Sequence, residues 1–478
     1  MHAPTTSFPQ RVTVAIHDQR LQAALDHASG GFVQKRAAQV AALPEYEALR
    51  ERAREVKEHV LSNLDAYLER YEAEVVRHGG QVHWASTAEE ARAIILEICR
   101  QANAKTITKG KSMVSEEIGL NDALEAAGYK VIETDLGEYI IQLAHEAPSH
   151  IIVPAVHKTR AQVADLFDTA HRPLGYTRHL TEVSEMVNEA RLVLREHYFK
   201  ADVGITGGNF LIAETGSSII VTNEGNGDLT QSLARVHIVT SGIERVVPTL
   251  DDALTFLRLL ARSATGQETE TYPTISTGPR RTGGATNDLD GPQEYHVVLV
   301  DNGRSKMLGG PFREMLRCIR CGACLNHCPV YTSIGGHAYG WVYPGPMGSV
   351  LTPLINGIDN AYDLPNACTL NGRCQTVCPV KIPLPGLLRE LRRQQFESGL
   401  TPAPIRLALQ AWAWGAQRAP LYHALMRIGI PLLNRLGRRR GALRWLPLAS
   451  GWTDTRDLPA PQRQTFQQAW KARKGARP

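Results

Sequence analysis

Long apolar runs are missing from this sequence. None of its segments has about 18 uninterrupted apolar residues, whereas a helix that crosses a membrane needs roughly 20. The opening stretch MHAPTTSFPQRVTVAIHDQR also lacks the apolar region of a secretory signal. We therefore expect a cytoplasmic protein without a membrane-spanning helix.

Cysteine is nearly absent outside one region. Seven of the eight cysteines lie between Cys318 and Cys378, which is not how a disulfide framework is distributed over a large chain. This distribution favours a reducing compartment. The remaining one, Cys99, stands in the apolar helical stretch AIILEICR and is expected to be a small buried hydrophobic residue.

Acidic residues are absent between Pro404 and Pro447, although the net charge of the whole chain is only +5. So small a net charge does not indicate a nucleic-acid partner. The acid-free segment carries eight arginines beside Trp412 and Trp414, and predicts either a surface that docks on an anionic membrane or an acidic redox partner, or a solvated basic face. These arginines are Arg406, Arg418, Arg427, Arg435, Arg438, Arg439, Arg440 and Arg444.

The periodicity of the sequence divides it into four segments. Residues 1–79 predict a helical arm, and residues 80–300 alternate β-branched runs with helical stretches, which indicates an α/β domain with a mostly parallel sheet. Residues 308–392 hold the cysteines, and residues 393–478 predict a basic helical region. The stretch from Glu268 to Asp290, rich in Gly, Thr and Pro, is expected to be a linker or a long loop.

Within the α/β domain the runs VHWAS, KTITKG, YKVIETD and HIIVPAV are predicted strands. Helices are expected to begin near Ser86, Ser115 and Lys158. The run ADVGITGGNFLIAETGSSIIVTNEGN and then HIVTSGIERVV add further strands.

Two nucleotide-binding motifs are excluded. The stretch TKGKS resembles part of a phosphate-binding loop, but Lys105 stands where the first glycine of that motif belongs, and no dinucleotide fingerprint follows a strand. Gly207, Gly208 and Asn209 lie in glycine-bearing turns whose amides could face an anion. Glu214, in the nearby AETGS turn, is a weak catalytic candidate, and the simpler interpretation is a carboxylate that hydrogen-bonds loops.

The cysteines form two related motifs, CIRCGACLNHCP and CTLNGRCQTVCP. The spacing of the first is that of an iron–sulfur motif whose fourth cysteine binds a second cluster, whereas zinc sites usually separate two Cys-x2-Cys hooks. By this crossing rule cluster one takes Cys318, Cys321, Cys324 and Cys378. Cluster two takes Cys328, Cys368 and Cys374.

Cluster two has only three cysteines because Asn371 stands where the first motif has Cys321. A neutral amide is a poor ligand for iron compared with thiolate. We expect one [4Fe-4S] cluster and, at the second site, a [3Fe-4S] cluster or a [4Fe-4S] cluster with a non-thiolate ligand. The long spacer between Cys328 and Cys368 has helical apolar spacing from Val350 to Ile358, which predicts a helical two-cluster ferredoxin module.

Several long motifs occur in an order that resembles the lactate utilization protein B family, the iron–sulfur subunits of a bacterial three-protein system that oxidises L-lactate to pyruvate. The motifs are KGKSMVSEEIGLN, ETDLGEYIIQL, GITGGNFLIAETGS, NEGNGDL and the paired cysteine motifs, with the tail LPLASGWTDTRDLP. The resemblance implies an α/β domain similar to the sugar-phosphate isomerase and CoA-transferase group, and two partner subunits. It assigns no catalytic residue for lactate.

Two functions remain open at this point. The first is an electron-transfer subunit of an L-lactate-oxidising complex, which passes electrons through two clusters towards a respiratory acceptor; such a subunit is expected in the cytoplasm or peripherally at the inner face of the membrane. The second is a ligand-binding or transferase-like α/β enzyme with chemistry at Glu214 and regulatory clusters. A crossed pair of clusters favours the first, because it places two redox centres close together.

Overall fold

Four helices precede the first strand of the computed structural model, which describes residues 7–281, 291–446, 453 and 456–475. They are α1 (Phe8–His17), α2 (Gln19–Ala41), α3 (Tyr46–Ser62) and α4 (Leu64–Arg77). Asp18 begins α2 by accepting hydrogen bonds from the N–H groups of Arg20 and Leu21. The chain divides into two compact units, residues 1–394 and 395–478.

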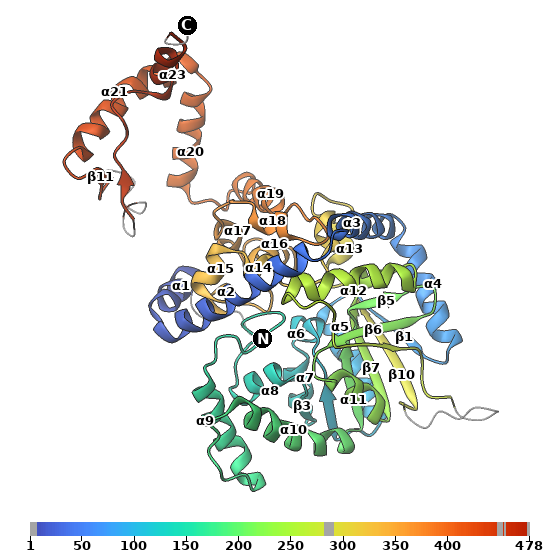
Figure 1. Cartoon of the computed structure of the whole chain (residues 1–478). Coiled ribbons are helices and arrows are strands. Elements are labelled where there is room, and N and C mark those ends of the chain that lie inside the picture. The colour runs from blue at the N-terminus through green and yellow to red at the C-terminus, as the bar shows by residue number, and fades with distance from the viewer. Residues whose placement is uncertain (1–6, 282–290, 447–452, 454–455, 476–478) are drawn as a thin grey trace. The chain divides into compact units, whose positions relative to one another are not determined.

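A six-stranded sheet with the order β1-β10-β7-β4-β2-β3 forms the centre of the first unit (Figure 1). Every neighbouring pair in it is parallel, as the alternation of the sequence predicts. The strands are β1 (Gln81–Ala85), β2 (Thr106–Lys109), β3 (Lys130–Glu133), β4 (Val203–Gly207), β7 (Val236–Gly242) and β10 (Glu294–Val300).

Both faces of this sheet are buried, because helices connect its parallel strands. Alternate residues of β10 enter different cores: Val297 and Leu299 join the large core shared with the cysteine motifs, whereas Val298 and Val300 pack in a second core with Cys99. The connecting helices are α5 (Ala88–Gln101), α6 (Met113–Glu117), α7 (Leu120–Ala126), α8 (Leu136–Leu143), α9 (Arg160–His171), α10 (Val183–Lys200), α11 (Asn226–Leu233) and α12 (Leu250–Ala264).

The predicted helix starts lie close to the observed ones, since α5, α6 and α9 begin at Ala88, Met113 and Arg160. The predicted strand HIIVPAV is wrong, because residues 150–156 form bends and turns. His150 accepts hydrogen bonds from the N–H groups of Ile152 and Val153 at 3.0 and 3.1 Å through its Nδ1 atom. These local bonds replace the ladder of a strand.

A second, four-stranded sheet has the order β8-β5-β6-β9. Its strands are β5 (Phe210–Ile212), β6 (Ser217–Thr222), β8 (Val246–Val247) and β9 (Tyr272–Ser276). The predicted linker from Glu268 to Asp290 is therefore only partly irregular, since β9 lies within it and pairs with β6; residues 282–290 lie outside the described residues. Because β9 is a partly exposed edge strand, it lacks the apolar alternation that reveals a strand in a sequence.

The cysteine region is helical, as its long spacer predicts, and residues 308–392 contain no strand. Figure 1 shows two of its helices, α14 and α15, beside α2. The helices are α13 (Arg304–Leu308), α14 (Ala323–Asn326), α15 (Pro329–Ile334), α16 (Gly345–Asn356), α17 (Asp363–Asn366), α18 (Arg373–Val377) and α19 (Leu384–Glu397). Short 3-10 helices are η1 (Arg172–Leu174), η2 (Ile243–Arg245), η3 (Arg313–Arg317) and η4 (His337–Tyr339).

The second unit consists mainly of helices, as expected, with one small antiparallel pair of strands that the sequence did not predict. Its elements are α20 (Ala403–Ala416), α21 (Ala419–Gly437), β11 (Ala442–Leu443), β12 (Leu458–Pro459) and α23 (Phe466–Gly475). Among the residues that the structure describes, no helix is both long and apolar enough to span a membrane.

Arg304 joins the parallel sheet to the cysteine region. The side chain is 1% exposed and bonds two buried carboxylates: Nη2 donates to Glu117 at 2.7 Å, and Nε donates to Glu244 at 2.7 Å. Tyr343, from the cysteine region, donates its hydroxyl to the same Glu117 at 2.6 Å. Each buried charge therefore has partners, which is the condition for tolerating it in a core.

Replacing Arg304 by Met should destabilise the chain strongly, because Glu117 would remain buried without its counter-ion and Glu244 would keep only the more distant Arg245 and Arg320. A loss of about 3–5 kcal/mol in the free energy of unfolding is typical of such a change. Urea denaturation of anaerobically purified protein, followed by circular dichroism, measures it. The control is Arg100→Ala, which removes an exposed pair with Glu97 and should leave the midpoint nearly unchanged. Equal shifts in both variants would contradict the importance of Arg304.

Candidate metal centres and the cavity beside them

The two cysteine motifs fold into matching loops. In each loop the second residue after the first cysteine has a left-handed backbone, with φ of 59° at Arg320 and 56° at Leu370. The amide of that residue points at the preceding sulfur, at 3.5 Å from Arg320 N to Cys318 Sγ and 3.3 Å from Leu370 N to Cys368 Sγ. A left-handed glycine then begins a short helix in both copies. The second loop thus keeps the shape of the first despite Asn371.

The fold brings the seven motif cysteines into two groups. One enclosed cavity is lined by Cys318, Cys321, Cys324 and Cys378. The thiol of Cys374 lies in a second group with those of Cys368 and Cys328, which add to the effect of burial in raising its pKa. The crossing rule predicts the same two sets as cluster ligands, and this assignment of ligands stays a prediction.

The donor atoms of both groups fit iron–sulfur clusters. Five of the seven cysteines are buried, and Cys318 and Cys368 are half-buried. Burial raises the pKa of the Cys374 thiol to about 12 and raises that of Cys324 well above its usual value. Binding of a metal would displace the protons of such buried thiols. Amides also face the crossing sulfurs, since Tyr331 N lies 3.5 Å from Cys328 Sγ and Ile382 N lies 3.4 Å from Cys378 Sγ.

Asn371 differs from its counterpart in environment as well as in chemistry. Cys321 is buried, whereas Asn371 is exposed. The Oδ1 atom of Asn371 accepts a hydrogen bond from the N–H of Arg373 at 3.0 Å, at the start of α18. The position of the second group that corresponds to Cys321 therefore faces solvent and carries no thiol.

The N-terminal helices hold the loop that carries Cys378. Arg50 on α3 donates from Nη2 to the carbonyl of Cys378 at 2.7 Å and to that of Thr376 at 3.0 Å. Arg36 on α2 donates to the carbonyl of Val377 at 3.1 Å. Because Cys378 must reach the other motif, these bonds fix the loop at the point where the two motifs cross.

A cavity of about 290 Å³ lies at the carboxyl edge of the parallel sheet. It is lined by the loops that follow β2, β3 and β4, and by Arg320 from between two ligand cysteines. Of the glycine-bearing turns singled out in the sequence, Gly207, Gly208 and Asn209 line it. Glu214 does not: it is exposed on the turn between β5 and β6. The structure therefore gives Glu214 no place in this cavity.

Six charged residues of the cavity were missed by sequence reasoning. They come from separate loops and meet only in the folded chain: Lys111, Asp135, Glu224, Arg245, Glu270 and Arg320. Lys111 Nζ lies 3.7 Å from a carboxylate oxygen of Asp135. Burial, together with the charge of Asp135, raises the pKa of Glu224 to about 7. The only sequence signal was the stretch TKGKS, which contains Lys111.

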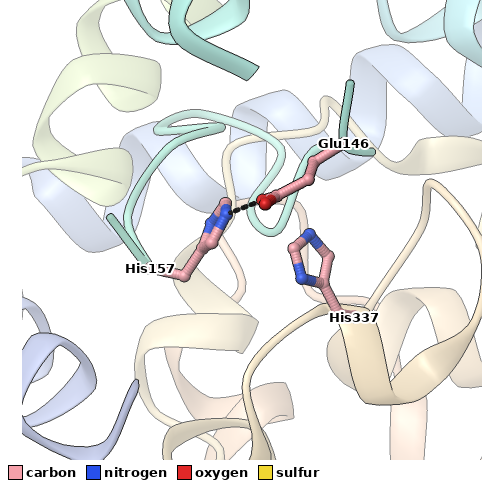
Figure 2. Close-up of side chains that lie close together, drawn as sticks. All are labelled: Glu146, His157 and His337. Atoms are coloured by element: carbon pink, nitrogen blue, oxygen red, sulfur yellow. Dashed lines mark hydrogen bonds and ion pairs between the residues drawn. The ribbon is translucent and has the colours of Figure 1, made fainter. Parts of the chain in front are cut away.

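Glu146, His157 and His337 form another group of metal-ligand types, in which all three side chains approach one another (Figure 2). The structure gives each of them a protein partner. His157 Nε2 lies 2.7 Å from Glu146, which also forms an ion pair with Lys158, and His337 Nε2 lies 2.7 Å from the carbonyl of Ala147. We interpret this group as a polar joint between the α/β domain and η4.

Comparison with known proteins places these features in families. Residues 68–300 match the LUD domain, and residues 314–382 match the 4Fe-4S dicluster domain, which identifies the cysteine region as an iron–sulfur module.

The relatives match along nearly the whole chain. Lactate utilization protein B of Lysinibacillus sphaericus is 43% identical over 99% of this chain and 98% of its own. The protein of that name from a Geobacillus strain is 44% identical over 96% of each chain. The uncharacterized electron transport protein YkgF of Escherichia coli is 42% identical over 98% of this chain and 96% of its own. With such identity over its full length, the chain belongs to the lactate utilization protein B family.

Proposed function

We propose that this chain is the iron–sulfur electron-transfer subunit of a complex that oxidises L-lactate to pyruvate and passes the electrons towards a respiratory acceptor. The observation that carries the proposal is the grouping of the seven cysteines into two crossed sets within one helical module. The names of the relatives support both halves of it, since they refer to lactate utilization and to electron transport.

The two sets of cysteines would hold two clusters with different ligands. Cys318, Cys321, Cys324 and Cys378 would bind a [4Fe-4S] cluster. Cys328, Cys368 and Cys374 would bind a [3Fe-4S] cluster, or a [4Fe-4S] cluster whose fourth iron has a non-thiolate ligand at the solvent-facing corner near Asn371. The clusters supply one-electron acceptors, and the chain supplies the amides and arginines that orient their ligands.

The alternative of a transferase-like enzyme with chemistry at Glu214 gains no support from the geometry. Glu214 is exposed and lies outside the cavity at the sheet edge, which is lined by the glycine turn and by buried charges. The electron-transfer role is therefore the function that the arrangement favours.

The partners we propose are the two other subunits of the lactate-utilization system and an anionic membrane surface. In the second unit, α20 and α21 expose large apolar side chains, including Trp412, Trp414 and Ile428. The acid-free segment places arginines beside them; the guanidinium of Arg418 lies 4.2 Å from the ring centroid of Trp414. Exposed aromatic and aliphatic side chains with neighbouring arginines are typical of helices that lie in a membrane interface.

The function predicts that L-lactate reduces the clusters when the chain is purified anaerobically with both partner subunits. Reduction should bleach the visible absorption of the clusters and should yield pyruvate in proportion to the electrons taken up. D-Lactate is the control for substrate specificity. Pyruvate formation with the clusters of this chain remaining oxidised would contradict an electron-transfer role.

The open corner of the second cluster predicts a distinct magnetic signal. If this cluster is [3Fe-4S], the oxidised chain should show an electron paramagnetic signal near isotropic g, and Asn371→Cys should diminish it because a fourth thiolate completes the cube. Iron content should rise in the same variant. Asn366→Cys is a control, since it adds a thiol outside both motifs. About eight irons per wild-type chain without this signal would instead indicate a complete cube with a non-thiolate ligand.

The acid-free segment predicts salt-sensitive membrane binding. The Debye length falls from about 10 Å at 0.1 M salt to about 3 Å at 1 M, so attraction between its arginines and anionic lipid should weaken over that range. Replacing Arg438, Arg439 and Arg440 by Gln should lower co-sedimentation with anionic vesicles at low salt. Neutral vesicles and the purified partner subunits serve as comparisons. Binding to the partner subunits alone would assign this surface to an acidic protein instead.

A further inference from the structure

The cavity beside the first set of cysteines lies where α/β sheets commonly bind ligands. The strand order in the sheet changes direction at β2. Strand β3 pairs with one edge of β2 and β4 pairs with the other edge, so the chain continues towards opposite sides of the sheet after β2 and after β4. Loops that diverge at such a point leave a crevice outside the carboxyl ends of the strands. Lys111 and Ser112 follow β2, and Gly207 to Asn209 close β4, so both diverging loops line the cavity.

Arg245 supplies hydrogen-bond donors that the protein itself leaves without acceptors. This residue is 6% exposed and lines the cavity, yet its Nε and Nη1 atoms make no hydrogen bond within the described residues. The nearest acidic group is Glu244, whose Oε1 lies 3.8 Å from Arg245 Nε. Buried donors without acceptors are costly, and a guanidinium has the fork geometry that matches a carboxylate.

Arg320 places a second guanidinium on the same cavity. It is 7% exposed, its Nε has no hydrogen-bond partner within the described residues, and its Nη2 lies 3.5 Å from Glu244 Oε1. The ring of Tyr343, 4.7 Å from the guanidinium carbon, holds the side chain in position. Because Arg320 lies between Cys318 and Cys321, a ligand bound to it would be close to the first cluster.

The charges around these arginines leave an excess of positive charge. Glu244 also accepts from Arg304, and its carbonyl accepts from the buried Lys57. The buried cations are Lys57, Arg245, Arg304 and Arg320, against the two carboxylates of Glu117 and Glu244. An anion in the cavity would balance part of this excess; the thiolates of the first cluster are the other negative charges within reach.

Acidic groups on the opposite wall do not cancel this excess. Asp135 is close to Lys111, at 3.7 Å. Burial raises the pKa of Glu224 to about 7, which reduces its negative charge near neutral pH, and burial also raises the pKa of Glu270. Glu270 also accepts a hydrogen bond from the backbone of Ala261 at 3.0 Å. The wall formed by Arg245 and Arg320 therefore stays the anion-attracting side.

We infer that this cavity binds a small carboxylate through Arg245 and Arg320, beside the first cluster. At about 290 Å³ it is at the small end of the ligand-binding range, which fits a compact acid rather than a nucleotide. The choice of a 2-hydroxy or 2-oxo carboxylate as the ligand rests on the proposed function. The polar side chains that could hydrogen-bond the 2-oxygen of this ligand are those of Ser112, Asn209 and Thr240.

The test is calorimetric titration of the anaerobically purified holo chain, without partners, with L-lactate and with pyruvate. Lactamide, which lacks the carboxylate charge, and inorganic phosphate are the comparison ligands. We expect saturable binding of the two acids only. Arg245→Gln should weaken it at least about tenfold, because it removes a charged hydrogen-bond pair. Arg100→Gln is a surface control that should bind as the wild type does.

A second readout separates binding from folding. Arg245→Gln should keep the wild-type iron content, and pyruvate should change the electron paramagnetic signal of the reduced first cluster in the wild type but not in this variant. Equal binding of phosphate or lactamide, or binding that Arg245→Gln leaves intact, would overturn the inference. Reduction of the clusters by lactate in the full complex, with no binding to the isolated chain, would also overturn it while leaving the proposed function in place.

Discussion

Cys378 lies with the three cysteines of the other motif, and this crossing ties the two motifs together. The two loops share one backbone shape, α16 lies between them in the chain, and bonds from the N-terminal helices fix the loop of Cys378. Arg36 and Arg50 provide those bonds from helices at the start of the chain. The N-terminal helices are therefore part of the metal-binding structure, although their sequence shows only helical periodicity.

Buried arginines link the first cysteine loop to the α/β domain. Arg304 joins the sheet to the cysteine region through Glu117 and Glu244, and Arg245 and Arg320 line the cavity. Burying several like charges together is favourable only when carboxylates, ligands or cluster charges compensate them. The same residues that join the domains thus determine the electrostatics of both the first cluster and the cavity.

The proposed ligand of the cavity would give the α/β domain a part in the proposed electron transfer. The walls of the cavity come from the sheet edge, from the turn of residues 150–156 and from the first cysteine loop. A ligand there would contact both domains, because Arg320 belongs to the cysteine loop and Lys111 to the sheet. Glu214, on a turn of the other sheet, takes no part in this arrangement.

The sequence alone indicated the parallel α/β class and the helical character of the cysteine module, because each depends on local spacing or periodicity; the cluster ligands that it also indicates stay a prediction. The turn at His150 and the edge strand β9 were not predictable, since one depends on a side chain that bonds its own backbone and the other on pairing with a distant strand. The position of the cavity and the residues that line it depend only on the tertiary structure. Lys111, Arg245 and Arg320 lie far apart in the chain, and no local pattern records that three cations from separate loops meet at one place.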